Sequence, residues 1–169
     1  AKGGEPESYY FAIHDSSSKK IVFGREEDGG TDHEVFSIST AEPDEWIHIV
    51  GIDDGSQLYI YINGIVEGTA DSQGWIAGST SDLLAFGTSI HYPTAIFSGN
   101  LDEILLFNRA LSNEEIQSLY HRELISNNLI GYWKFNAGEG STTLYDHSGN
   151  ANHRTINSAT WSTDVSCES

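Results

Sequence analysis

The chain has 169 residues, 38% of them hydrophobic, with four Trp, eight Tyr and seven Phe. This composition suits one folded domain with a substantial core, excludes intrinsic disorder, and contains no apolar run long enough to span a bilayer. The formal net charge of −17, from 25 acidic and 8 basic residues, repels phosphate backbones and anionic lipid. We therefore expect no nucleic-acid partner and no membrane insertion, and any bound glycan should be neutral or bridged by metal, not sulfated.

Cys167 is the single cysteine of the chain, so one copy has no disulfide framework and no cysteine-based zinc site. We expect Ala1 to lie inside a longer protein, and the lack of a signal peptide then says little about export.

Hydrophobic residues mostly alternate with polar ones, and the turns are rich in Gly, Asn, Asp and Ser, which predicts an all-β protein. Leu58–Ile62 alternates aliphatic and aromatic residues and runs into Asn63-Gly64 and then Ile65-Val66. Asn-Gly is the preferred two-residue turn of a β-hairpin, because both positions take positive φ. Further strands are predicted over residues 9–15, 19–24, 46–50, 83–89, 101–107 and 129–135, with a loop over 91–100.

One short helix is predicted. Ser112 and Glu115 form a capping box, and Ile116, Leu119 and Tyr120 follow at helical spacing, so the helix should run to about Arg122. Residues 145–153 are too polar and turn-rich for a strand. Many strands with one helix predict a two-sheet antiparallel jelly-roll sandwich.

Several segments follow one another in an order that resembles a known family. Those that resemble the C-terminal two thirds of laminin-G-like domains, within the concanavalin A-like jelly-roll superfamily, are 46–50, 58–64, 99–104 and 108–112. Residues 129–135 and 146–153 resemble the opening of such a domain. The resemblance implies a lectin-like sandwich and a calcium site.

The segment that resembles the opening of the domain comes after the segment that resembles its end. Two interpretations fit: a chain cut across two tandem repeats, or a late segment that folds back as in a circular permutation. We expect residues 1–125 to form the C-terminal two thirds of a jelly roll and residues 126–169 to fold back and complete the same sandwich. Completing strands also offer a route to self-association.

The resemblance implies calcium ligands at Asp102, where the family often has an Asp at the start of the closing strand, and at Asp146. Asn150 and His153 are expected to add backbone oxygens, since calcium takes six to eight oxygen ligands. Two carboxylates predict weak affinity, about 10⁻⁴–10⁻³ M. The alternative is that Asp146 and Asn150 only form Asx-turns. Arg154 stands where these domains often have Gly.

Sugar binding by β-sandwiches needs exposed aromatic rings beside polar groups. The candidates are Trp75, then His91 and Tyr92, and the same-face pair Tyr59 and Tyr61. The alternative for each ring is that it covers the rim of the core.

A hydrolase of this superfamily needs two carboxylates on one cleft. Asp102 and Glu103 are adjacent and point to opposite faces of a strand, and aliphatic residues follow, so this strand does not hold the pair. The seven histidines match no common zinc pattern.

These observations predict a non-catalytic, calcium-stabilised recognition module of a secreted or cell-surface protein that binds glycan or an extracellular protein. The first alternative is a structural repeat of a large extracellular adhesin without a ligand of its own. A glycoside hydrolase remnant is the second.

Overall fold

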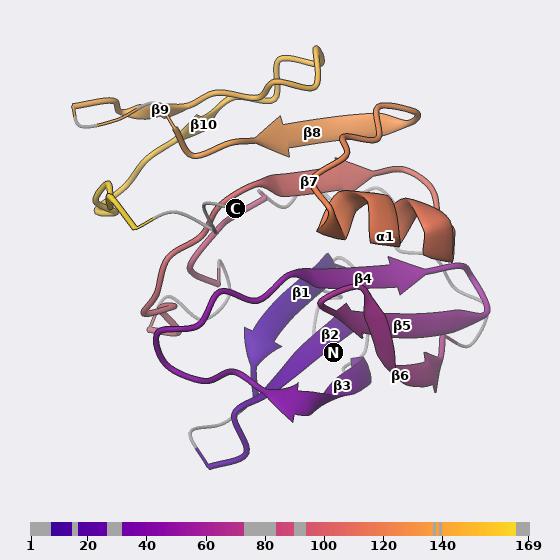
Figure 1. The fold of residues 1–169 in the computed structure, drawn as a ribbon. Coiled ribbons are helices and arrows are strands. Elements are labelled where there is room, and N and C mark those ends of the chain that lie inside the picture. Colours follow the sequence, from indigo (N-terminus) through magenta and orange to yellow (C-terminus); the bar gives the residue numbers. More distant parts are fainter. Residues whose placement is uncertain are drawn as a thin grey trace, which may run out of the picture. The chain divides into compact units, whose positions relative to one another are not determined.

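The computed structural model describes residues 8–14, 17–26, 32–72, 84–89, 94–136, 138 and 140–164. The chain forms two compact units, Ala1–Leu83 with Ala110–Leu124, and Leu84–Arg109 with Ile125–Ser169. Both are built from antiparallel strands, and the described residues contain one helix (Figure 1). The predicted all-β class with one short helix is confirmed.

The first unit contains two three-stranded antiparallel sheets. One has the order β1 (Ser8–Ile13), β2 (Lys20–Glu26) and β3 (Asp32–Thr40). The other has the order β4 (Ile49–Asp53), β5 (Gln57–Ile62) and β6 (Ile65–Asp71). Asn63 and Gly64 join β5 to β6 with φ of 50° and 79°, so the predicted hairpin is confirmed.

The core of the first unit lies between these two sheets. Alternate residues of β5, Leu58, Ile60 and Ile62, are buried against Phe23 of β2 and Val35 of β3. The side chains of a strand alternate between its faces, so Tyr59 and Tyr61 point to the opposite face of the β4–β5–β6 sheet. Here Tyr61 packs with Ile52 and with a residue of the helix.

That residue is Ile116 of α1 (Asn113–Tyr120), which is fully buried. Ser112 is the N-cap: its hydroxyl accepts from the Glu115 amide at 3.3 Å, and the Ser112 amide donates to the Glu115 carboxylate at 2.9 Å. The predicted capping box is confirmed. Through Ile116, α1 packs on the face of the β4–β5–β6 sheet that carries the two tyrosines.

The second unit contains two antiparallel strand pairs. β7 (Ile104–Phe107) pairs with β8 (Leu129–Trp133), with Ile104 opposite Trp133. β9 (Thr143–Leu144) pairs with β10 (Arg154–Thr155). A strand from before the helix therefore shares a sheet with one from after it. That residues 126–169 complete the sandwich of residues 1–125 stays a prediction.

The predicted strands differ from the structure at their ends, and at three of them the structure shows the cause. The strand expected at Trp46 begins at Ile49, because its partner β5 ends at Ile62 and His48 instead exchanges hydrogen bonds with Asn63 of the turn. The strand expected at Leu101 begins at Ile104, since Glu103 takes a φ of 49° that interrupts the extended backbone.

The strand expected to end at Phe135 stops at Trp133, and Phe135 itself has a φ of 54°. The strand predicted over 83–89 is wrong for its described part: residues 84–89 contain only an isolated bridge from Thr88 to Ile96. Gly87, with a φ of 76°, turns the chain, and Phe86 packs on Trp133 instead of extending a sheet.

Candidate functional site

A surface pocket of about 320 Å³ lies in the first unit, between the strand β5, the turn before it and the start of the helix. The residues that line it are Ile52, Asp54, Tyr59, Tyr61, Ala110, Leu111, Ser112 and Asn113. The two predicted tyrosines are therefore brought together, beside a carboxylate and an amide that the sequence did not single out.

The two tyrosine rings differ in what they offer a ligand. Tyr61 is only 8% exposed, packs against Ile116, and donates its hydroxyl to Asn113 Oδ1 at 2.8 Å. Tyr59 is half-buried and donates its hydroxyl to Asp54 Oδ2 at 3.2 Å. Burial raises the pKa of both phenols, which therefore stay protonated at neutral pH. Tyr61 is mainly part of the rim of the core, whereas Tyr59 presents a ring to the pocket.

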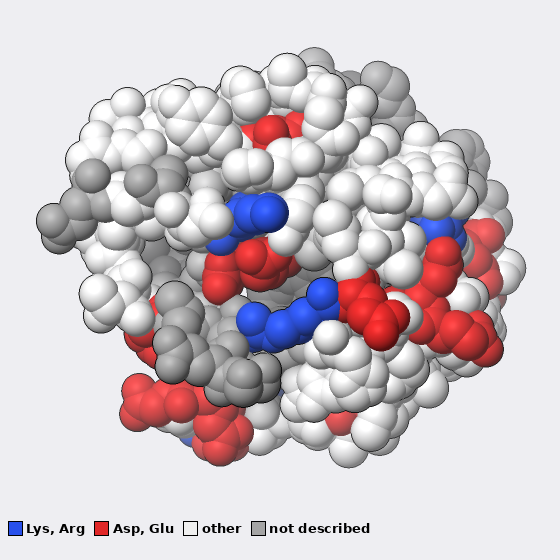
Figure 2. Space-filling model, turned by 45° about the horizontal axis from the view of Figure 1, so that its top comes forward, with Lys and Arg blue, Asp and Glu red and all other residues white. Residues whose placement is uncertain are grey.

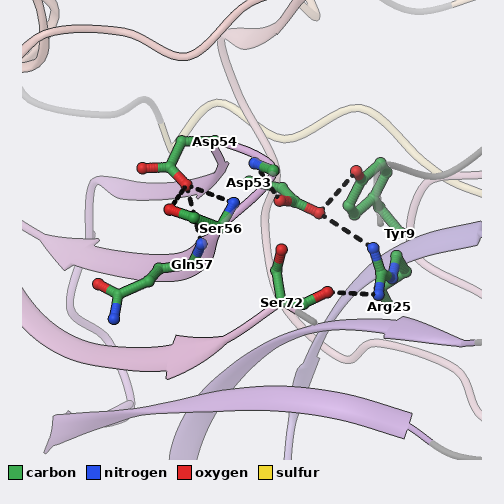
Figure 3. Close-up of polar contacts among 8 residues, drawn as sticks. Tyr9, Arg25, Asp53, Asp54, Ser56, Gln57 and Ser72 are labelled. Carbon is green, nitrogen blue, oxygen red and sulfur yellow. Dashed lines mark hydrogen bonds and ion pairs between the residues drawn. The ribbon is translucent and has the colours of Figure 1, made fainter. Parts of the chain in front are cut away.

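Asp54 shapes the turn that carries it towards Tyr59. Its Oδ1 accepts from the Ser56 hydroxyl at 2.7 Å and from the Ser56 and Gln57 amides, both at 2.8 Å (Figure 3). The hydrogen bond from the Ser56 hydroxyl, followed by those from the two amides, lowers the pKa of Asp54 to about 2. The carboxylate is thus ionised at neutral pH, with Oδ2 on the side of the tyrosine ring.

A buried ion pair supports this turn from the inside. Arg25 Nη1 lies 3.5 Å from Asp53 Oδ2, with the two side chains 0% and 3% exposed. Tyr9 donates to the same oxygen at 2.9 Å, and Arg25 Nη2 donates to the Ser72 carbonyl at 2.9 Å (Figure 3). The pair joins β2 to the end of β4, so Asp53 is held inside while Asp54 faces the pocket.

The predicted calcium ligands Asp146, Asn150 and His153 lie in one loop of the second unit. The Asp146 carboxylate accepts from the amides of Tyr132, Ser148 and Asn152 and from the Ser148 hydroxyl, at 2.8–2.9 Å. Asp146 Oδ1 accepts from Ser148, two residues on, as in an Asx-turn, and ties the loop to β8.

The other proposed ligands also make hydrogen bonds within the protein. Asn150 donates its side-chain amide to the carbonyls of Leu129 and Ile130, and the His153 ring accepts from the Asp146 amide at 3.1 Å. Asp102 accepts from the Glu103 amide at 3.0 Å. Among the described residues, no three His, Cys, Asp or Glu side chains gather as a metal site.

The four hydrogen bonds that the Asp146 carboxylate accepts hold the loop, and a calcium ion at Asp146 would have to replace some of them. Calcium binding at these residues stays a prediction. Of the other predicted ligand-binding residues, Trp75, His91 and Tyr92 lie outside the described part of the chain.

Asp54 and Asn113 are the site residues that the sequence reasoning missed. A run such as Asp53-Asp54-Gly55 is typical of a turn, but a turn signal does not say what lies next to it. Asn113 was placed only as the first residue of the helix, and its contact with Tyr61 spans 52 positions.

Comparisons with known proteins agree with this architecture. Residues 1–117 match a laminin G family model described as the concanavalin A-like lectin/glucanases superfamily. No curated protein and no solved structure matches the chain. Laminin G-like domains are typically non-catalytic and commonly extracellular. In the described part of the chain, no helix has both the length and the apolar character needed to cross a membrane. The match spans more than half of the sequence, and the chain therefore belongs to the laminin G-like domains of the concanavalin A-like superfamily.

Proposed function

We propose that this chain is a non-catalytic recognition module of a secreted or cell-surface protein, and that it binds carbohydrate in the pocket beside Tyr59. The observation that supports this most is the combination in one pocket of a half-exposed phenol ring, an ionised carboxylate and a side-chain amide. The volume of about 320 Å³ lies at the lower end of the range for small-ligand pockets.

The three groups suit the two kinds of surface on a sugar ring. The phenol ring of Tyr59 offers an apolar face on which the C–H side of a pyranose can stack. Asp54 Oδ2 accepts hydrogen bonds, and a carboxylate binds hydroxyl groups more strongly than a neutral acceptor does. Asn113 adds an amide with both donors and an acceptor. One sugar residue would thus meet an apolar platform and polar partners within the same pocket.

The negative charge of the chain favours a neutral sugar over an acidic one as the ligand. The chain carries a formal charge of −17, and on the face in Figure 2 acidic side chains form several groups, with basic side chains beside some of them. The pocket itself contains the ionised Asp54. A sulfated or uronic-acid glycan would be repelled, so a neutral sugar is the expected ligand.

The rival functions make different use of these residues. In a structural repeat without a ligand, the tyrosines would only pack against their neighbours. Their replacement would then change the stability of the fold and no glycan binding. A hydrolase would need two carboxylates on one cleft, and β7, with the sequence Ile-Leu-Leu-Phe, supplies neither of them. In addition, Tyr132 donates its hydroxyl to the carboxylate of Glu103, which occupies that group within the protein.

The experiment is a glycan array with the whole protein, run with and without a chelator, on the wild type and on Tyr59→Ala, Asp54→Asn and Tyr145→Ala. Tyr145 is the matched control, because it is an exposed tyrosine of the second unit. We expect a neutral glycan to bind the wild type and Tyr145→Ala alike. Tyr59→Ala should bind at least about tenfold more weakly, the loss of about 1.4 kcal/mol of ring contact.

Asp54→Asn keeps an oxygen acceptor for the turn but removes the negative charge, so it separates turn stability from ligand binding. An array without any bound glycan favours the structural repeat. Equal binding by Tyr59→Ala and the wild type places the ligand elsewhere and contradicts the proposal.

A further inference from the structure

A second pocket, of about 350 Å³, lies in the second unit and plays no part in the site beside Tyr59. The residues that line it are Gly140, Ser141, Ala159, Thr160 and Trp161. None of these five described residues is charged, in contrast to the pocket that contains Asp54. We propose that this pocket is a second carbohydrate subsite, in which the indole of Trp161 stacks on a neutral sugar.

The indole is available to a ligand. Trp161 is half-buried, whereas the other described tryptophan of the same unit, Trp133, is only 1% exposed and serves the core. Trp133 also donates its indole N–H to the Asn152 carbonyl, as a buried tryptophan should. Trp161 is therefore an aromatic ring of the second unit that lines a pocket and remains partly open to solvent.

The chain is tied to its own unit on both sides of Trp161, by a backbone bond before it and a side-chain bond after it. Before it, the Ile156 amide donates to the Thr142 carbonyl at 3.0 Å and extends the β9–β10 pairing. After it, Asp164 Oδ2 accepts from the Asn100 side-chain amide at 2.8 Å. A ring carried on a constrained backbone loses less conformational entropy on binding than one on a free end, which suits a stacking platform.

The hydroxyl groups beside the ring suit a polar but uncharged ligand. The Ser141 hydroxyl donates to the Thr143 carbonyl at 2.8 Å and accepts from the Thr143 amide at 3.3 Å. A hydroxyl has one donor and two acceptor lone pairs, so Ser141 retains an acceptor for a sugar hydroxyl. Thr160 is exposed and adds a second hydroxyl. An indole with two hydroxyls matches the alternation of C–H faces and hydroxyl edges on a neutral pyranose.

The test uses the whole protein and the neutral gluco-, galacto-, manno- and xylo-oligosaccharides of a glycan array. The variants are Trp161→Ala, Trp161→Phe and Tyr59→Ala. We expect at least one of these glycans to lose about tenfold or more in affinity for Trp161→Ala, as removal of a stacked ring predicts, and to keep its affinity for Tyr59→Ala. Trp161→Phe retains a flat ring and should stay within about threefold of the wild type, about 0.6 kcal/mol.

Binding by Trp161→Phe, together with tryptophan fluorescence, distinguishes the loss of the stacked ring from a loss of folding as the cause of weaker binding. Sugar binding should change the tryptophan fluorescence of the wild type, and Trp161→Phe should still bind but lose that change. Wild-type affinity in Trp161→Ala for every neutral glycan that binds, or the absence of any neutral glycan ligand, overturns this inference. A glycan that responds to Tyr59→Ala and not to Trp161→Ala supports the first pocket alone.

Discussion

Arg25 and Asp53 form an ion pair that is buried on both sides, with 3.5 Å between Nη1 and Oδ2. It connects the two sheets of the first unit directly behind the turn that presents Asp54. Removal of one partner leaves the other charge buried without its counterion, which is far more costly than the loss of a surface pair.

We therefore expect Asp53→Ala to lower the free energy of unfolding by about 3–5 kcal/mol. Asp53→Asn, which keeps an acceptor for Tyr9 and Arg25, should lose less. The control is Glu42→Ala, which breaks the exposed pair of Lys19 and Glu42 and should leave urea unfolding close to the wild type. Equal effects of Asp53→Ala and Glu42→Ala would show that the buried pair contributes no more than an exposed one.

Asp146 should govern part of the stability at acid pH. Burial raises its pKa, but hydrogen bonds from three amides and the Ser148 hydroxyl outweigh this and lower the pKa from 3.8 to about 2. The ionised group therefore stabilises the fold above about pH 4, and this contribution is lost as the pH falls towards 2.

Asp146→Asn should remove that part of the pH dependence, since the group no longer titrates. It should also cost about 1–3 kcal/mol at pH 7, because an amide NH₂ faces backbone donors in place of one oxygen. Melting curves from pH 2 to 7 measure both effects. A wild-type acid profile in Asp146→Asn would contradict the assignment.

His48 should make the stability of the fold depend on pH in a higher range than Asp146 does. Its Nδ1 is buried without a hydrogen-bond partner in the described structure, and burial lowers its pKa below 6.5. The unfolded chain then takes up a proton at a higher pH than the folded chain does. The contribution of His48 to stability is thus complete above about pH 6.5, falls as the pH drops from there towards the lowered folded pKa, and stays constant below it.

The measurement is chemical unfolding between pH 5 and 8 on the wild type and on His48→Phe, with His121→Gln, at the exposed end of α1, as the control. The slope of stability against pH should flatten only in His48→Phe. A wild-type slope in that variant shows that another group is responsible.

The predicted calcium site at Asp146 is tested separately from sugar binding. Calcium at about 10 mM is about 10–100 times the predicted Kd and should stabilise the fold by about 1.4–2.7 kcal/mol if Asp146 is a ligand, whereas an Asp146 carboxylate that keeps its four hydrogen bonds should leave the melting temperature within about 1 °C. Calorimetry of the chelated protein with calcium, and with magnesium as the control, measures this. A calcium-specific rise that Asp146→Asn abolishes would establish the predicted site and require the loop to rearrange.

The sequence by itself determined the features whose causes lie within a few residues. The Asn63-Gly64 turn follows from the positive φ that both residues tolerate, and the start of α1 follows from the reciprocal hydrogen bonds of Ser112 and Glu115. The alternation of Leu58–Ile62 likewise predicted a strand with two different faces.

Only the tertiary structure decided what those faces meet. Whether Tyr59 or Tyr61 remains exposed to solvent depends on which of them α1 packs against. The ion pair of Arg25 and Asp53 likewise joins residues 28 positions apart. The ends of the strands also depend on the partner strand. β4 begins at Ile49 because β5 offers backbone hydrogen bonds only as far as Ile62. Local patterns specify backbone conformation, whereas burial, ion pairs and pockets arise from contacts between segments whose distance along the chain leaves no local signal.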